Sequence, residues 1–181
     1  MGILHRVDDM TGQNGTPAPI PSITTESKTK LERLSDECTK AIYAGTKVTL
    51  KDGISYDFTY DLHDQSNISE MFNACLAGAT GYIYHSNDGS CRTYTAEDIV
   101  TIYYTLSLFK TGQTTYFNQL KQYALTLSQE EIETIFYGQP LTGIYLEEYN
   151  TLMQYAKNQL DSVISKITAR SQESYYASYN I

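Results

Sequence analysis

The spacing of hydrophobic residues along the chain changes several times, and each change predicts a new element of secondary structure. Apolar residues recur every three or four positions over roughly residues 24–44, which predicts an amphipathic helix that ends at Gly45. A second helix is predicted after Asp61, a typical N-cap residue, and ends at Gly78. Between and after these helices the period falls to two residues, which is typical of strands.

Two β-hairpins are predicted where alternating runs flank a turn. The first joins residues 48–50 to residues 54–60 through Asp52-Gly53, and an Asp-Gly turn between alternating runs is the strongest short-range hairpin signal. The second joins residues 82–85 to residues 91–94 through an Asn-Asp-Gly turn. We expect the short strands to pair into one small antiparallel sheet. The order hairpin, helix, hairpin then predicts an α+β fold.

Helical spacing dominates the rest of the chain. Apolar residues hold a helical period over residues 96–127, where Gly112 either kinks the helix or divides it in two. A capping box from Ser128 to Glu131 begins a short helix. A last helix of roughly 25 residues follows. Its apolar seam consists of Tyr145, Tyr149, Leu152, Ala156, Leu160, Val163 and Ile167.

These elements group into three segments. Residues 1–45 form an N-terminal arm and a linker helix, residues 46–140 an α+β body, and residues 141–181 a long C-terminal helix with a Tyr-rich tail. The arm combines a Gly-containing stretch with alternating prolines, which favours an extended conformation. The predicted fold class is therefore α+β: a small antiparallel sheet of two β-hairpins, several α-helices, a long C-terminal helix and an extended N-terminal arm.

Composition and charge narrow the range of partners. The net charge is −8, from 13 Lys and Arg against 21 Asp and Glu, which disfavours binding to nucleic acid and to anionic membranes. No apolar run approaches the roughly 18 residues that cross a bilayer. The 17 tyrosines suit half-buried positions and subunit interfaces, because each ring buries a large area while its hydroxyl still needs a polar partner.

The second hairpin contains the best candidates for a chemical site. His85, Asp88 and Cys91 bracket its turn, and a His and a Cys across a hairpin can share a zinc ion. No fourth ligand is identifiable, and the same residues also fit a turn with His85 and Cys91 packed across the two strands. The sequence lacks the common nucleotide-binding, hydrolase and zinc-protease motifs. We therefore predict no catalytic residue, no cofactor and no metal site.

Interaction surfaces are predicted at the two ends of the chain. The seam of the last helix fits three alternatives, namely packing on the body of the same chain, self-association, and docking into a groove on a partner. An arm that becomes ordered on binding can cover a large surface of its partner. The predicted interface residues are Pro17, Pro19, Pro21, Tyr145, Tyr149, Leu152 and Leu160.

The body contains several short strings that are distinctive as a set. They are Val48-Thr49-Leu50-Lys51-Asp52-Gly53, then Phe58 and Asp64-Gln65-Ser66-Asn67-Ile68, Tyr84-His85-Ser86-Asn87-Asp88-Gly89-Ser90-Cys91-Arg92, Tyr94-Thr95-Ala96-Glu97-Asp98, Thr114-Thr115-Tyr116-Phe117-Asn118 and Phe136-Tyr137-Gly138. Through these strings, roughly residues 46–140 resemble small proteins encoded in the tail-gene region of phages and prophages of Gram-positive hosts. The resemblance implies a tail accessory or baseplate-region component, which is a part of the virion with no established active site.

The resulting hypothesis is a non-enzymatic structural component of a phage tail or baseplate. It would be present in several copies, would dock on neighbouring virion subunits through its terminal arms, and would pass through the host cytoplasm during assembly. One alternative is a tail or fibre assembly chaperone that is absent from the mature virion. A second alternative is a receptor-binding or carbohydrate-binding module that contacts the host surface through exposed tyrosines.

Overall fold

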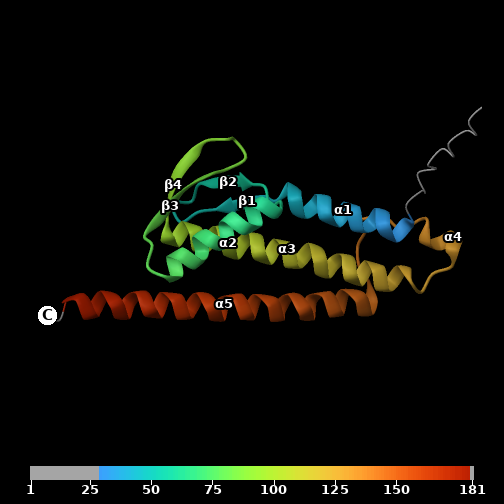
Figure 1. Cartoon of the computed structure of the whole chain (residues 1–181). Helices are drawn as coiled ribbons and strands as arrows, with labels where there is room; N and C mark the ends of the chain where they lie inside the picture. The colour runs from blue at the N-terminus through green and yellow to red at the C-terminus, as the bar shows by residue number, and fades with distance from the viewer. Residues whose placement is uncertain (1–28, 180–181) are drawn as a thin grey trace, which may run out of the picture.

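The computed structural model describes the backbone of residues 29–179 and the side chains of residues 29–165 (Figure 1). The predicted α+β fold class is confirmed, whereas the expected N-terminal arm with Pro17, Pro19 and Pro21 lies outside the described residues. The elements are α1 (Lys30–Ala44), β1 (Thr46–Thr49), β2 (Ser55–Phe58), α2 (Leu62–Leu76), β3 (Gly81–His85), β4 (Cys91–Thr95), α3 (Ala96–Ala124), α4 (Gln129–Ile132) and α5 (Gly143–Tyr179).

Local signals in the sequence determine where the first four helices begin. Each of these helices starts with a capping box, in which the N-cap side chain and an acidic side chain three residues later each accept a hydrogen bond from the other's backbone N–H. The N-cap residues are Thr29, Asp61, Thr95 and Ser128. The end of α1 is equally local, because Gly45 has a φ of +71° and its backbone N–H bonds to the Ile42 carbonyl.

The expectation of one sheet is wrong, because the described strands form two separate antiparallel pairs, β1 with β2 and β3 with β4. The hairpins meet through the turn of the second one. The Asn87 backbone N–H donates to the Asp57 carbonyl at 2.9 Å, and the Asn87 side chain accepts from the Thr59 N–H. Arg92 also lies 4.7 Å above the Tyr56 ring. Side-chain and turn contacts therefore replace a shared ladder of strand hydrogen bonds.

Helix α3 is the centre of the fold and runs unbroken from Ala96 to Ala124, so Gly112 does not divide it. Figure 1 shows α3 between α1 and α5, with α2 and both hairpins around its first half. Two hydrophobic clusters follow each other along this helix. The first contains Val48, Phe58, Ile68, Tyr94, Ile99, Ile102 and Leu106, and the second contains Leu34, Leu120, Ala124, Ile135 and Leu141.

Helix α1, which the sequence pattern assigned to an arm and linker, packs on the body. Its Leu34 and Cys38 are buried, and Leu34 belongs to the second cluster. On its surface, Arg33 forms a 2.7 Å ion pair with Glu133, and Lys30 donates to the carbonyl of the same residue. These contacts connect α1 to the segment that follows α4.

Helix α5 is longer than the pattern predicts. It spans 37 residues, from Gly143 to Tyr179, so the helix continues through most of the segment expected to be a polar tail. Among the described residues, no helix combines the length and the apolar character that crossing a membrane requires.

Candidate functional site

Helix α5 packs on α3 with a seam that differs from the predicted one. Its half-buried residues include Tyr145, Tyr149, Met153, Ala156 and Leu160. The predicted seam instead placed Leu152 and Val163 inside, but these side chains are 39% and 42% exposed. Met153 and Ile164 face α3 in their place. A straight helix has 3.6 residues per turn, so its buried face drifts away from a seam that repeats every 3.5 residues.

The four predicted interface residues on α5 therefore have different surroundings. Tyr145 and Tyr149 pack against the second cluster, and the Tyr145 ring lies 5.5 Å from the Tyr123 ring of α3. Leu160 is half-buried. Leu152 is exposed and remains available to a partner. Of the alternatives for the seam, the two tyrosines therefore follow the first, which is packing on the body of the same chain.

A set of exposed apolar side chains lies beside this seam, on one side of α5, and we refer to it as the α5 flank. Tyr155 and Ile144 are its most exposed members, at 64% and 70%. Its residues are Ile144, Leu152, Tyr155 and Val163. Isolated exposed apolar residues are common on proteins, whereas these four follow one side of the helix between positions 144 and 163 and form a stripe that a partner could cover.

The second hairpin has the geometry of a turn with cross-strand packing. His85 and Cys91 are register partners, and the His85 ring stacks on the neighbouring Tyr84 ring at 4.6 Å. Asp88 forms an ion pair with Arg92, and this hydrogen bond holds the pKa of the Asp88 carboxyl well below its usual range. Within the described part of the chain, no group of three or more His, Cys, Asp or Glu side chains could hold a metal ion.

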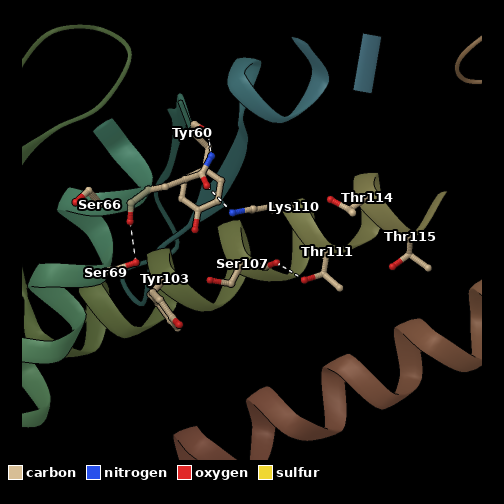
Figure 2. Close-up of a pocket in the computed structure, with 10 residues that line it drawn as sticks. Tyr60, Ser66, Ser69, Tyr103, Ser107, Lys110, Thr111, Thr114 and Thr115 are labelled. Atoms are coloured by element: carbon tan, nitrogen blue, oxygen red, sulfur yellow. Dashed lines mark hydrogen bonds between the residues drawn. The ribbon is translucent and has the colours of Figure 1, made fainter. Parts of the chain in front are cut away.

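A polar groove of about 620 Å³ lies between the start of α2 and the middle of α3, as Figure 2 shows. The α2 side is formed by Gln65, Ser66 and Ser69, with Tyr60 from the segment before the helix. The α3 side is formed by residues at successive helical turns, which places them on one face of the helix. They are Tyr103, Ser107, Lys110, Thr111, Thr114 and Thr115.

A chain of hydrogen bonds positions the cation of this groove. The Lys110 ammonium donates to Oε1 of Gln65, and Nε2 of Gln65 donates to the Tyr60 carbonyl at 2.9 Å. Tyr60 is only 3% exposed, and its hydroxyl is directed toward Ser107 (Figure 2). Burial raises the pKa of the Tyr60 hydroxyl, whereas the hydrogen bond with Ser107 acts in the opposite direction.

The sequence reasoning missed this groove, although a signal for it is present. Ser107, Thr111 and Thr114 are small polar residues three or four positions apart, so they lie on one face of α3, and the apolar core does not use this face. A small polar face is also compatible with a solvated surface. This polar face indicates a groove only when the position of α2 beside α3 is known.

A second groove of about 420 Å³ lies between α3 and α5. Gly112 forms part of its wall, and Tyr116, Tyr137, Tyr149 and Met153 surround it. Two of these hydroxyls are occupied within the chain: Tyr116 donates to the Gln139 carbonyl at 2.7 Å, and Tyr137 donates to Gln113 at 2.7 Å. These bonds indicate that the second groove is a gap in the packing between helices.

The fold and its surfaces define a small α+β domain assembled around one long central helix. The chain belongs to the family described as a domain of unknown function, DUF4376, whose pattern matches residues 25–137. The matched range includes α1 and both hairpins and ends before α5. No curated protein and no solved structure matches the chain.

Proposed function

We propose that the protein is a non-enzymatic structural component of a phage tail or baseplate, present in several copies in the virion. Its partners are neighbouring tail or baseplate subunits, including further copies of itself. It reaches the virion from the host cytoplasm, where assembly takes place. Two observations support this proposal: the resemblance of residues 46–140 to proteins of the tail-gene region, and the surface of α5.

The observation that carries the proposal is that α5 packs along α3 and then continues beyond it. The helix runs antiparallel to α3, and Val100 and Thr101, near the start of α3, line one groove with Ile164 and Ser165. The backbone of α5 continues to Tyr179, beyond the start of α3 at Ala96, and Figure 1 shows its C-terminal end extending past the rest of the described chain. Most of the stability of a helix in a protein comes from packing of one of its faces, so a partner that covers this end would stabilise it.

The α5 flank gives a partner a place to bind on the part of the helix that packs along α3. Its apolar side chains lie beside the seam with α3, so a neighbouring subunit can cover the flank without displacing the packing of Tyr145 and Tyr149. Burial of the four side chains of the flank would supply an apolar centre for the contact. The N-terminal residues 1–22 are the second proposed contact.

Mass spectrometry of purified particles, produced from the genome that encodes the chain, tests the proposal. A structural component is present in them at a fixed ratio to the other tail proteins. An assembly chaperone is found in the lysate but not in the particles, and that result would overturn the proposal.

Variants of the flank test the route of docking. Tyr155→Lys and Val163→Lys place a charge on the α5 flank, and we expect both to fold normally by circular dichroism while their incorporation into particles falls at least about tenfold. Gln154→Lys is the matched control, because Gln154 is exposed on α5 away from the flank. Normal incorporation of the flank variants, or equal loss with the control, argues against this contact.

A further inference from the structure

The polar groove between α2 and α3 has the composition of a binding site rather than of a packing defect. Six of its ten lining residues are Ser or Thr, two are Tyr, and the remaining two are Gln65 and Lys110. A gap left by imperfect packing between apolar helix faces would be lined by apolar side chains. Its volume of about 620 Å³ lies within the range of small-ligand sites, about 300–1,000 Å³.

The groove is also built into the fold. Tyr60 reaches it from the segment before α2 and is 97% buried, since only 3% of its surface is exposed. The Tyr103 ring, at one end of the groove, stacks on the Phe72 ring of α2 at 3.9 Å with the two planes only 6° apart. The stacked Phe72 and Tyr103 rings hold α2 against α3 at this end, so the two walls of the groove are positioned before any ligand arrives.

We infer that this groove binds a short acidic glycan, meaning a sugar chain that carries a carboxylate. This binding site is additional to the proposed structural role and does not depend on it. Sugars present hydroxyl groups that both donate and accept hydrogen bonds, and Ser, Thr and Tyr hydroxyls have the same dual capacity. Ser69 and Thr111 already donate to backbone carbonyls of their own helices at 2.7 and 2.9 Å, so they offer the ligand acceptors. Thr114 and Thr115 extend this row of hydroxyls along α3, as Figure 2 shows, so the groove fits an elongated ligand.

Lys110 gives the site its preference for an anion. The ten lining residues include this cation and no acidic residue, although the whole chain has a net charge of −8. An ammonium has three N–H donors, and the contacts of the described residues use one of them, on Gln65. Two donors therefore remain for a carboxylate, and Gln65 holds the ammonium beside the groove. A charge-assisted hydrogen bond is roughly twice as strong as a neutral one.

Calorimetric titration of the full chain with trigalacturonic acid, and with its neutral methyl ester, tests this inference. We expect saturable 1:1 binding of the acid, and binding of the ester that is at least about tenfold weaker. Lys110→Gln should weaken binding of the acid by about tenfold and leave binding of the ester unchanged. Thr114→Val should weaken both ligands, because it removes a hydroxyl and preserves the volume of the side chain.

Lys121→Gln is the matched control, since Lys121 is an exposed cation on the same helix and does not line the groove. We expect it to bind the acid as the wild type does. Inorganic phosphate is titrated in parallel to identify a site for anions alone. The inference is overturned if the acid does not bind, if the two lysine variants lose affinity equally, or if phosphate binds as tightly as the acidic glycan.

Discussion

The Tyr84 hydroxyl donates a 2.7 Å hydrogen bond to Oδ1 of Asp64, and both residues are buried. The same Asp64 carboxylate completes the capping box of α2 by accepting from the backbone N–H of Asp61 at 3.3 Å. One buried acid therefore joins strand β3 to the first turn of α2. The second hairpin and α2 are fixed to each other by this contact as well as by apolar packing.

Tyr84→Phe removes this contact without changing the shape of the core. The Asp64 carboxylate then stays buried with one donor fewer, which is costly, so we expect the free energy of unfolding to fall by about 1–3 kcal/mol. Urea denaturation followed by circular dichroism measures the change. Tyr82→Phe is the control, because Tyr82 is half-buried against the same cluster and its hydroxyl has no hydrogen bond among the described residues. An equal loss in both variants would contradict the role of the Tyr84 hydroxyl.

Buried tyrosines also predict how stability depends on pH. Burial raises the pKa of Tyr84 above its usual value, and the hydrogen bond to Asp64 raises it further. Burial raises the pKa of Tyr137 in the same way, with a contribution from Cys38. In the unfolded chain both phenols ionise near pH 10. Above that pH the unfolded state binds fewer protons than the folded state, so stability is fully present below about pH 10 and falls as the pH rises.

Urea denaturation at a series of pH values from neutral to strongly alkaline measures this loss. The double variant Tyr84→Phe, Tyr137→Phe starts from a lower stability but should lose less of it above about pH 10, because two of the groups that ionise earlier in the unfolded chain are gone. If the variant and the wild type lose stability with the same slope, other groups are responsible for the alkaline unfolding.

Two glycines have opposite tolerance for a side chain. A Cβ at Gly112 would lie 3.5 Å from Met153 and 3.6 Å from the Tyr149 hydroxyl, which is ordinary contact. Alanine has the higher helix propensity, so we expect Gly112→Ala to stabilise the protein by about 0.5–1 kcal/mol. A Cβ at Gly45 would lie 1.8 Å from the Phe58 carbonyl oxygen at a φ of +71°.

Gly45→Ala is therefore expected to destabilise the protein by on the order of 3 kcal/mol or more. Thermal and urea unfolding of the two variants provide the measurement. A destabilised Gly112→Ala would show that α3 and α5 approach each other more closely at this point than the structure indicates. A harmless Gly45→Ala would show that the chain between α1 and β1 can move away from β2.

Local chemistry explains why much of this fold is predictable. The capping residues Thr95 and Ser128, the Asp52-Gly53 turn and the glycine at position 45 each act over a few residues, and a sequence displays such signals directly. The sequence does not decide whether Gly112 divides α3, because one glycine costs a helix only about 1 kcal/mol and tertiary packing decides the outcome.

The errors lie where distant segments meet. The hairpins do not share a sheet and instead meet through the backbone and side chain of Asn87 and through Arg92, and no local pattern specifies such contacts. The polar groove is not predictable from the sequence for the same reason, since Gln65 and Lys110 are 45 positions apart in the sequence. In the α5 seam, Leu152 and Met153 are equally apolar neighbours, and only the position of α3 selects one of them.

The choice between these two neighbours provides the last prediction. Met153 is half-buried and faces Gly112 of α3, whereas Leu152 is 39% exposed on the α5 flank. Truncating a buried Met or Leu to Ala costs about 2–5 kcal/mol, so Met153→Ala, at a half-buried site, should lower the free energy of unfolding by about 1–2 kcal/mol. Leu152→Ala should change it by less than about 0.5 kcal/mol. If instead Leu152→Ala is the more destabilising variant in dilute solution, then the seam inferred from the sequence is the correct one, and the α5 flank is not free to bind a neighbouring subunit.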